Sequence, residues 1–219
     1  NGVLVQFPEA LRQRAFNQRH PEPSPSGVPN HPTSLNQKQI MNSPPLVLDI
    51  ELILSDVDGV LSDGGIIFNN QGIEMKKFHI RDGLGIKLWQ RAGYQFGILT
   101  ARTSQIVKLR AAELGISIVR QGFEDKLPAA IQIIEQLNLQ PSQVCYIGDD
   151  LTDIAVIRHV GLGAAVSNAV EEVRQVADYL TTSAGGMGAV RELIEMLLKE
   201  KGRWKDLIRH YDGNQAPLS

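Results

Sequence analysis

The amino-acid sequence predicts an α/β protein with a doubly wound parallel sheet and helices on both faces. Short apolar segments alternate with segments of helical periodicity between about residues 50 and 200. The first apolar segment, residues 52–54, is followed closely by two aspartates and a glycine. Such a change is expected where a buried parallel strand ends at the sheet edge that binds ligands. The 219 residues, 42% of them apolar, suffice for one domain of ordinary size.

Charge, apolar runs and cysteine content indicate which binding partners and which cellular compartment to expect. A formal net charge of −2, with both signs interspersed, provides no basic surface for nucleic acid or an anionic membrane. The sequence has no run of about 20 apolar residues that would span a bilayer, and its start does not resemble a secretory signal. The single cysteine, Cys145, lies in an apolar run and is expected in the core of a protein kept reduced. We therefore expect a cytoplasmic protein that binds neither nucleic acid nor membrane.

Three segments of different character divide the chain. Residues 1–45 are rich in proline and polar residues, so we expect a disordered extension, with Met41 as a plausible natural start. Residues 46–202 carry the apolar periodicity and form the predicted folded domain. Residues 203–219 are expected to be a C-terminal tail.

Residues 65–78 predict a β-hairpin that follows the first strand. Two short strands flank a turn rich in asparagine and glycine. A lone two-stranded hairpin is marginally stable in water, and this one carries several large apolar side chains. We therefore expect the hairpin either to protrude and pack against a neighbouring molecule or to fold back against its own domain.

The remaining elements follow in alternation. Helices are predicted over residues 82–93, 103–114, 128–137, 170–176 and 188–198, with a short one ending at Ile157. Strands are predicted over residues 94–99, 116–119, 144–147 and 162–166.

Polar side chains stand where the predicted strands end, and a doubly wound sheet brings such ends into one crevice. Structural alternatives exist for some of them, because Thr100 and the Asp150–Asp153 pair could cap the helices that follow. Lys126 is harder to explain in this way, since a lysine in the first turn opposes the helix dipole unless an anion binds there. The candidates are Asp56, Asp58, Thr100, Lys126, Asp149, Asp150 and Asp153.

Residues 56–60, residues 98–102, Lys126 and residues 148–153 resemble, in order, the four successive motifs of the haloacid dehalogenase-like phosphatases. The hairpin with residues 63–64, 81–86 and 185–192 resembles the branch that contains 3-deoxy-D-manno-octulosonate 8-phosphate phosphatase. The resemblance covers about residues 50–200. It implies a Rossmann-like sheet and hydrolysis of a phosphate monoester, in lipopolysaccharide precursor synthesis for that branch.

The resemblance also implies roles for individual residues. Asp56 would be the nucleophile, and Asp58 would protonate the leaving oxygen and later deprotonate water. Thr100 and Lys126 would hold phosphoryl oxygens. Mg²⁺ would be held by the carboxylates of Asp56 and Asp149 and the backbone carbonyl of Asp58, with Asp150 or Asp153 in support. Gly59, Arg81, Arg102 and Arg191 are the remaining substrate-binding candidates, the arginines for the sugar carboxylate.

Motif spacing leaves no room for the cap domain that many members of this family carry. A capless member either accepts a large substrate such as a phosphoprotein or takes its cover from a neighbouring subunit. The apolar hairpin favours the second, and the resembled branch implies a homotetramer assembled through hairpins.

Departures from the family pattern concern the substrate more than the chemistry. Ala101 replaces the usual glycine after the motif-two threonine, Ala155 a usual proline, and residues 168–170 the usual Ala-His-Pro. The expected substrate is 3-deoxy-D-manno-octulosonate 8-phosphate. The alternatives are a nine-carbon acidic sugar phosphate of the sialic type, or a non-catalytic oligomerisation module of sugar-acid nucleotide synthesis.

Overall fold

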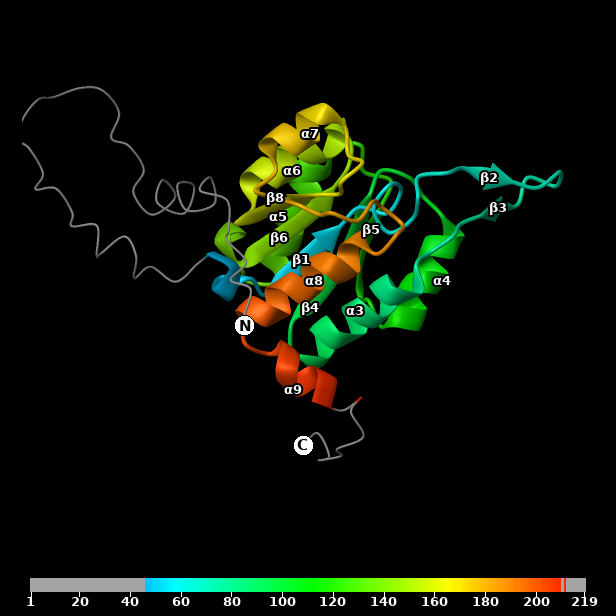
Figure 1. The fold of residues 1–219 in the computed structure, drawn as a ribbon. Coiled ribbons are helices and arrows are strands. Elements are labelled where there is room, and N and C mark those ends of the chain that lie inside the picture. The colour runs from blue at the N-terminus through cyan, green and yellow to red at the C-terminus, as the bar shows by residue number, and fades with distance from the viewer. Residues whose placement is uncertain (1–45, 210, 212–219) are drawn as a thin grey trace, which may run out of the picture.

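The computed structural model describes residues 46–209 and 211, and the predictions for residues 1–45 lie outside this part of the chain. Within it, six strands form a parallel sheet in the order β5-β4-β1-β6-β7-β8 (Figure 1). This confirms the predicted fold class. The strands are β1 (Leu52–Ser55), β4 (Gln95–Thr100), β5 (Ile118–Gln121), β6 (Val144–Gly148), β7 (Leu162–Ala165) and β8 (Tyr179–Leu180).

Strand β1 lies in the interior of the sheet, with β4 on one side and β6 on the other. Leu52 pairs with Gln95 of β4 and with Val144 of β6. All four β1 residues are buried, as expected of a strand covered on both faces. The chain adds β4 and β5 on one side of β1 and then β6, β7 and β8 on the other. The order therefore reverses at β1, which is where open α/β sheets bind ligands.

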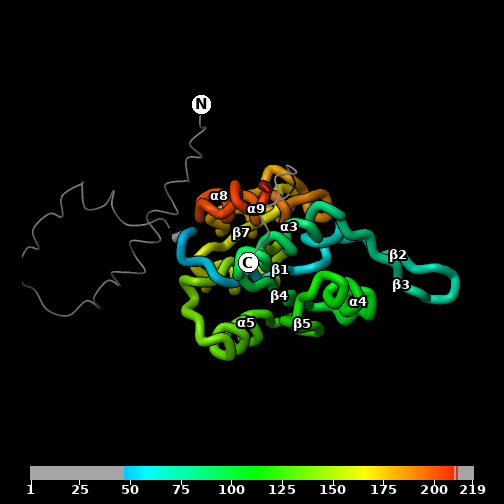
Figure 2. The backbone as a smooth tube through the Cα atoms, turned by 90° about the horizontal axis from the view of Figure 1, so that it is seen from below, coloured from blue at the N-terminus to red at the C-terminus, as the bar shows by residue number. Residues whose placement is uncertain are grey.

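Helices cover both faces of the sheet. Helices α3 (Ile80–Arg91) and α8 (Ala189–Glu200) pack side by side on one face, with α4 (Gln105–Leu114) next to α3 (Figures 1 and 2). Helices α5 (Lys126–Gln136), α6 (Ile154–His159) and α7 (Glu171–Val176) follow one another on the other face. Short 3₁₀ helices η1 (Leu46–Asp49), η2 (Pro141–Gln143) and η3 (Leu151–Asp153) complete these layers.

The core fills the space between the sheet and these helices. Trp89 of α3 is fully buried and donates its indole N–H to the carbonyl of Gln95 at 2.7 Å. Cys145 is also fully buried, as predicted. Helix α5 begins two residues before the predicted start, because Pro128 is tolerated within a first turn, where amide groups lack intrahelical partners.

The predicted hairpin is present and projects from the body of the molecule (Figure 2). Strands β2 (Ile67–Phe68) and β3 (Glu74–Met75) pair antiparallel. Most of its large apolar side chains are exposed, with Phe68 56% accessible. In the described chain, only this hairpin and α3 lie between β1 and β4, so no cap domain is inserted there.

Two short elements extend the predicted set. Strand β8 adds to the sheet edge beside β7. Helix α9 (Trp204–Arg209) lies within the segment expected as a tail, and its Leu207 is buried. Among the helices of the described residues, none has the length and apolar character needed to cross a membrane.

Candidate active site

The turn after β1 carries Asp56 to the carboxyl edge of the sheet. Its amide donates to the carbonyl of Ile147 at 3.1 Å, which continues the pairing of β1 with β6. Gly59 then adopts φ +95°, a left-handed conformation that favours glycine. A Cβ at Gly59 would lie 2.0 Å from Oδ2 of Asp149. The structure thus places Gly59 where two site segments approach closely.

The glycine-rich segment before α8 supports this turn from another side. A Cβ at Gly185 would lie 1.6 Å from the carbonyl oxygen of Gly59, and the amide of Gly186 donates to the carbonyl of Val60 at 2.8 Å. The start of α8 is in turn fixed by α3, because the amide of Arg191 donates to Oδ1 of buried Asp82 at 2.7 Å. Burial raises the pKa of this carboxyl.

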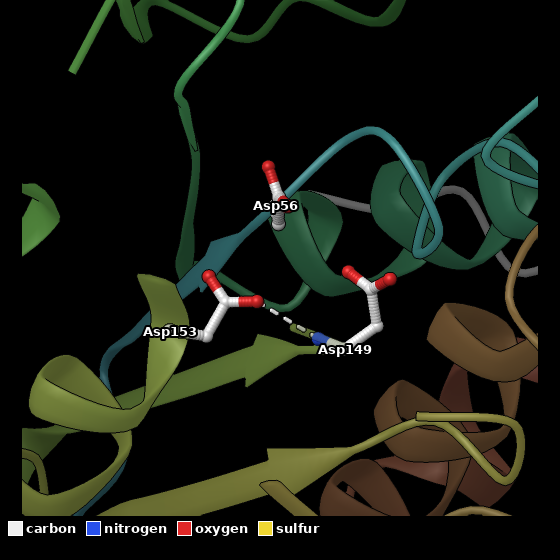
Figure 3. A group of neighbouring side chains, drawn as sticks. All are labelled: Asp56, Asp149 and Asp153. Atoms are coloured by element: carbon white, nitrogen blue, oxygen red, sulfur yellow. Dashed lines mark hydrogen bonds between the residues drawn. The ribbon is translucent and has the colours of Figure 1, made fainter. Parts of the chain in front are cut away.

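Three carboxylates meet beside the turn. Asp56, Asp149 and Asp153 each offer an oxygen, and these oxygens lie within 4.8 Å of one another (Figure 3). Oδ1 of Asp56 and Oδ1 of Asp149 are buried and have no hydrogen-bond partner among the described residues. Buried polar atoms without partners are costly, so two such oxygens in one cluster indicate a position that a cation would fill.

Burial and then the mutual proximity of these carboxylates raise the pKa values of Asp56 and Asp149. Burial, followed by the charge of Asp153, raises the pKa of Asp56 to about 6. Burial, followed by the charges of Asp56 and Asp153, raises the pKa of Asp149 to about 8. Perturbed carboxyl groups in a crevice are typical of functional sites.

Lys126 places a positively charged side chain among these carboxylates. It is the first residue of α5, its side chain is 1% exposed, and its Nζ lies 3.0 Å from Oδ2 of Asp56 and 2.6 Å from Oδ1 of Asp153. Burial alone would lower the pKa of Lys126, but the charges of Asp153 and Asp56 outweigh it and the pKa is raised. The lysine is therefore an ammonium held between two carboxylates, as its unfavourable position at a helix start suggested.

Asp153 acts as the hub of these contacts. Its Oδ1 accepts from Nζ of Lys126 and from the buried hydroxyl of Tyr146, both at 2.6 Å. Its Oδ2 accepts from the amide of Asp149 at 2.8 Å (Figure 3). The same oxygen accepts from the amide of Asp150 at 3.1 Å. Four donors occupy this carboxylate, so it is suited to position its neighbours rather than to bind a metal.

Asp150 is not brought into the cluster. It is exposed, and its Oδ1 accepts from the amide of Leu151 at 2.8 Å, which caps η3. The helix cap expected as the structural alternative is therefore present, and Asp153 takes part in it by accepting from the amide of Asp150. Asp153 also lies in the acidic cluster, whereas Asp150 does not.

Asp58 is not part of the acidic cluster and instead pairs with the hairpin. Its carboxylate forms an ion pair with Lys76, lies 3.9 Å from Nε of Arg102, and is 3.5 Å from the hydroxyl of Ser62. The two aspartates of the turn, one residue apart, therefore have different neighbours, as separate chemical roles would require.

Two residues of the hairpin stem outside the predicted candidates, Glu74 and Lys76, also contact site residues. Glu74 accepts from Nη2 of Arg102 at 2.9 Å and from the hydroxyl of Ser104 at 2.6 Å. The signal was present in the sequence, because charges two residues apart on a strand share one face while Met75 between them faces the other way. The exposed Met75 agrees with this.

Thr100 ends β4 next to the β1 turn. Ser55 pairs with Ile98, so Thr100 lies two positions further along the same edge. Thr100 is buried. It does not cap α4, since that helix begins at Gln105 with Ser104 as the preceding residue.

Arg81 and Arg191 lie together along a separate cleft of about 430 Å³ between the start of α3 and α8. Arg191 pairs with Glu195 at 3.3 Å and its guanidinium lies 5.1 Å from the ring centroid of Trp204. In the described chain, no hydrogen bond or ion pair joins either arginine to the acidic cluster.

Comparison with known proteins agrees with this geometry. Residues 109–194 match the family model described as haloacid dehalogenase-like hydrolase. The chain is 44% identical over 155 residues to the 3-deoxy-D-manno-octulosonate 8-phosphate phosphatase KdsC of Escherichia coli K12, covering 71% of this chain and 82% of that protein.

Solved structures of phosphatases that act on the same sugar acid phosphate, from other organisms, are also similar to this chain. The phosphatase of this name from Moraxella catarrhalis, in complex with magnesium, phosphate and KDO, superposes with a TM-score of 0.75 at 43% identity, over 76% of this chain and 95% of that one. The cobalt-bound deoxy-D-mannose-octulosonate 8-phosphate phosphatase from Haemophilus influenzae gives a TM-score of 0.71 at 36% identity, over 73% and 93% of the two chains.

Proposed function

This chain belongs to the haloacid dehalogenase-like phosphatases, in the branch of the 3-deoxy-D-manno-octulosonate 8-phosphate phosphatases, and we propose that it hydrolyses 3-deoxy-D-manno-octulosonate 8-phosphate with Mg²⁺. The observation that carries the chemistry is the pair of unpartnered carboxylate oxygens beside buried Lys126. Support for the substrate is the 44% identity over most of the E. coli relative's length.

The acidic cluster fits a divalent cation. Three carboxylates and one ammonium carry two net negative charges when all are ionised. Oxygen ligands of this kind suit Mg²⁺, the ion in the Moraxella catarrhalis relative. We assign Asp56 and Asp149 as carboxylate ligands, with the Asp58 backbone carbonyl. When bound, Mg²⁺ would reduce the repulsion between the substrate's phosphate and Asp56.

Asp56 is the proposed nucleophile. Its carboxylate attacks phosphorus, an aspartyl-phosphate forms, and the bond from phosphorus to the sugar oxygen breaks. Lys126 and Thr100 hold phosphoryl oxygens while charge builds on them. The contact between Lys126 and Asp56 supports the lysine's part, because it puts the ammonium beside the reacting carboxylate.

Asp58 is the proposed acid and base. It gives a proton to the leaving sugar oxygen and then takes one from the water that attacks the aspartyl-phosphate, which releases phosphate and restores Asp56. Its position in the same turn as Asp56, with different neighbours, supports this division of work.

The sugar carboxylate is assigned to arginine, which can bind it bidentately. At least one of Arg81 and Arg191 serves this purpose, with Arg102 nearer the phosphate; the shared cleft supports the pairing of the first two. Of the two alanine substitutions, at least one should lower kcat/KM for the acidic sugar phosphate by an amount corresponding to about 1.5–3 kcal/mol, and leave an aryl phosphate nearly unaffected. Equal losses on both substrates would exclude this role.

A homotetramer assembled through the hairpins completes the proposal. Ile66, Ile67, Phe68, Ile73 and Met75 are each between 46% and 58% exposed on a projecting two-stranded hairpin. Such an apolar surface indicates an interface, and cyclic or dihedral symmetry would pair identical hairpins.

The function is tested by phosphate release from purified protein. Three substrates are compared: 3-deoxy-D-manno-octulosonate 8-phosphate, a nine-carbon sialic-type 9-phosphate and p-nitrophenyl phosphate. We expect the highest kcat/KM on the first, loss of activity with EDTA, and only background with Asp56→Asn. A preference for the nine-carbon ester would overturn the proposed substrate. Substantial residual turnover by metal-free Asp56→Asn would overturn the proposed chemistry.

A further inference from the structure

The stem of the hairpin buries a lysine against the candidate acid–base residue. Lys76 directly follows β3, and its side chain is only 1% exposed although the hairpin itself projects into solvent. Its ammonium forms an ion pair with Asp58 and lies 3.4 Å from Oε1 of Glu74. A buried ammonium is costly unless paired, so this arrangement needs both carboxylates.

Glu74 ties the same stem to the segment after β4. Its two oxygens accept from Arg102 at 2.9 Å and from Ser104 at 2.6 Å. The hairpin of one chain therefore contacts the turns after both β1 and β4. These contacts exist within a single chain, independently of any neighbouring subunit.

Lys76 is the close partner of Asp58 among the described residues. The other two groups near this carboxylate, Ser62 at 3.5 Å and Arg102 at 3.9 Å, are at the limits for a hydrogen bond and an ion pair. An aspartate side chain rotates freely about two bonds unless its carboxylate is held. Removing Lys76 would thus leave Asp58 weakly restrained.

We infer that Lys76 is a positioning residue, which holds the Asp58 side chain where its protonated form can give a proton to the leaving oxygen of the substrate. The inference rests on the proposed acid–base role of Asp58. It does not depend on which sugar acid is the substrate, since a phosphate monoester of any alcohol makes the same demand.

Leaving-group basicity separates this role from a structural one. A sugar or phenolate oxygen needs a proton as it departs, whereas p-nitrophenolate leaves readily without one. A misplaced Asp58 should therefore slow phenyl phosphate far more than p-nitrophenyl phosphate. The value of kcat/KM is suitable, because it covers the steps through alcohol release and excludes hydrolysis of the aspartyl-phosphate.

The experiment compares Lys76→Met with wild type on both aryl phosphates in the presence of Mg²⁺. General acid catalysis contributes about 10²–10⁴-fold, so we expect a loss of at least about 10-fold on phenyl phosphate and a several-fold smaller loss on p-nitrophenyl phosphate. Lys76→Arg should recover part of the loss. Lys77→Met is the matched control. The side chain of Lys77, the next residue, is 60% exposed and pairs with Asp63, so this variant should behave as wild type.

Two further variants make each outcome decisive. Asp58→Asn must lose more activity on phenyl phosphate than on p-nitrophenyl phosphate. If it does not, both the acid–base role of Asp58 and the positioning role of Lys76 are overturned. If Asp58→Asn shows it and Lys76→Met loses both substrates equally, the positioning role alone is overturned. Lys76→Gln, which keeps a donor, replaces the methionine variant should that variant not fold. Failure to hydrolyse 3-deoxy-D-manno-octulosonate 8-phosphate would affect the proposed substrate and leave these ratios interpretable.

Discussion

Replacing Lys126 by methionine keeps a flexible side chain of similar length but removes the charge between Asp56 and Asp153. Removing one partner of a buried ion pair costs about 3–5 kcal/mol, because the remaining charge stays in a poorly solvated position. Asp153 keeps three other donors, the hydroxyl of Tyr146 and two backbone amides. We therefore expect the lower end of that range, about 3 kcal/mol.

The assay is thermal unfolding of metal-free protein in EDTA, followed by calorimetry. For a domain of this size, 1 kcal/mol shifts Tm by about 2–4 °C, so Lys126→Met should unfold about 6–12 °C below wild type. Adding Mg²⁺ should narrow the gap, because the variant's cluster carries one more net negative charge and a cation that binds the folded state raises Tm. Lys108→Met, at an exposed site on α4, is the control.

A Tm for Lys126→Met within about 2 °C of wild type would refute the reasoning, since the predicted energy could not then be stored in the contacts of Lys126. A gap that widens with Mg²⁺ would show instead that the lysine is needed for metal binding.

Three other perturbations have definite outcomes. Burial and then neighbouring charges raise the pKa of Asp149 to about 8. The metal-free folded state therefore binds a proton that the unfolded chain releases at lower pH, so denaturation midpoints should fall as the pH rises from about 5 to 8. Asp149→Asn should flatten that slope, and an unchanged slope would contradict the assignment. Asp82→Ala removes the acceptor for the Arg191 amide and should cost about 1.5–3 kcal/mol in urea unfolding; a midpoint equal to wild type would show that α8 needs no such cap. The double substitution of Ile67 and Phe68 by aspartate should convert the proposed tetramer to smaller species in light scattering, whereas wild type that is already monomeric would exclude the interface.

The sequence predicted the sheet well because its central strands are unambiguous. An apolar run that ends in two aspartates and a glycine has few structural interpretations besides a buried strand and a turn at the ligand edge. Strand β8 and helix α9 are short, two and six residues, and no periodicity can be recognised over such lengths. They form because the neighbouring β7 and α8 provide surfaces, which only the folded chain contains.

The sequence indicates candidate residues for the site but not the contacts that they make. Lys126 was singled out by its position against a helix dipole, and the structure explains it through two carboxylates. The choice between Asp150 and Asp153 could not be made from spacing, because the 3₁₀ turn between them decides which one faces inward. The apolar pattern that predicts the hairpin does not reveal the contact of Lys76 with Asp58, which lies 18 positions earlier in the chain.

The contact of Gly185 with Gly59 has a consequence for how the protein is made. The turn that carries Asp56 and Asp58 is seated by a segment that leaves the ribosome long after it, once Thr100, Lys126 and Asp149 have all been synthesised. Bringing such distant positions together is also among the slower steps of folding. A nascent chain therefore holds every proposed reacting group for much of its synthesis without the support that fixes their turn. We expect the finished protein, and not its growing precursor, to be the first species able to cleave a phosphate ester.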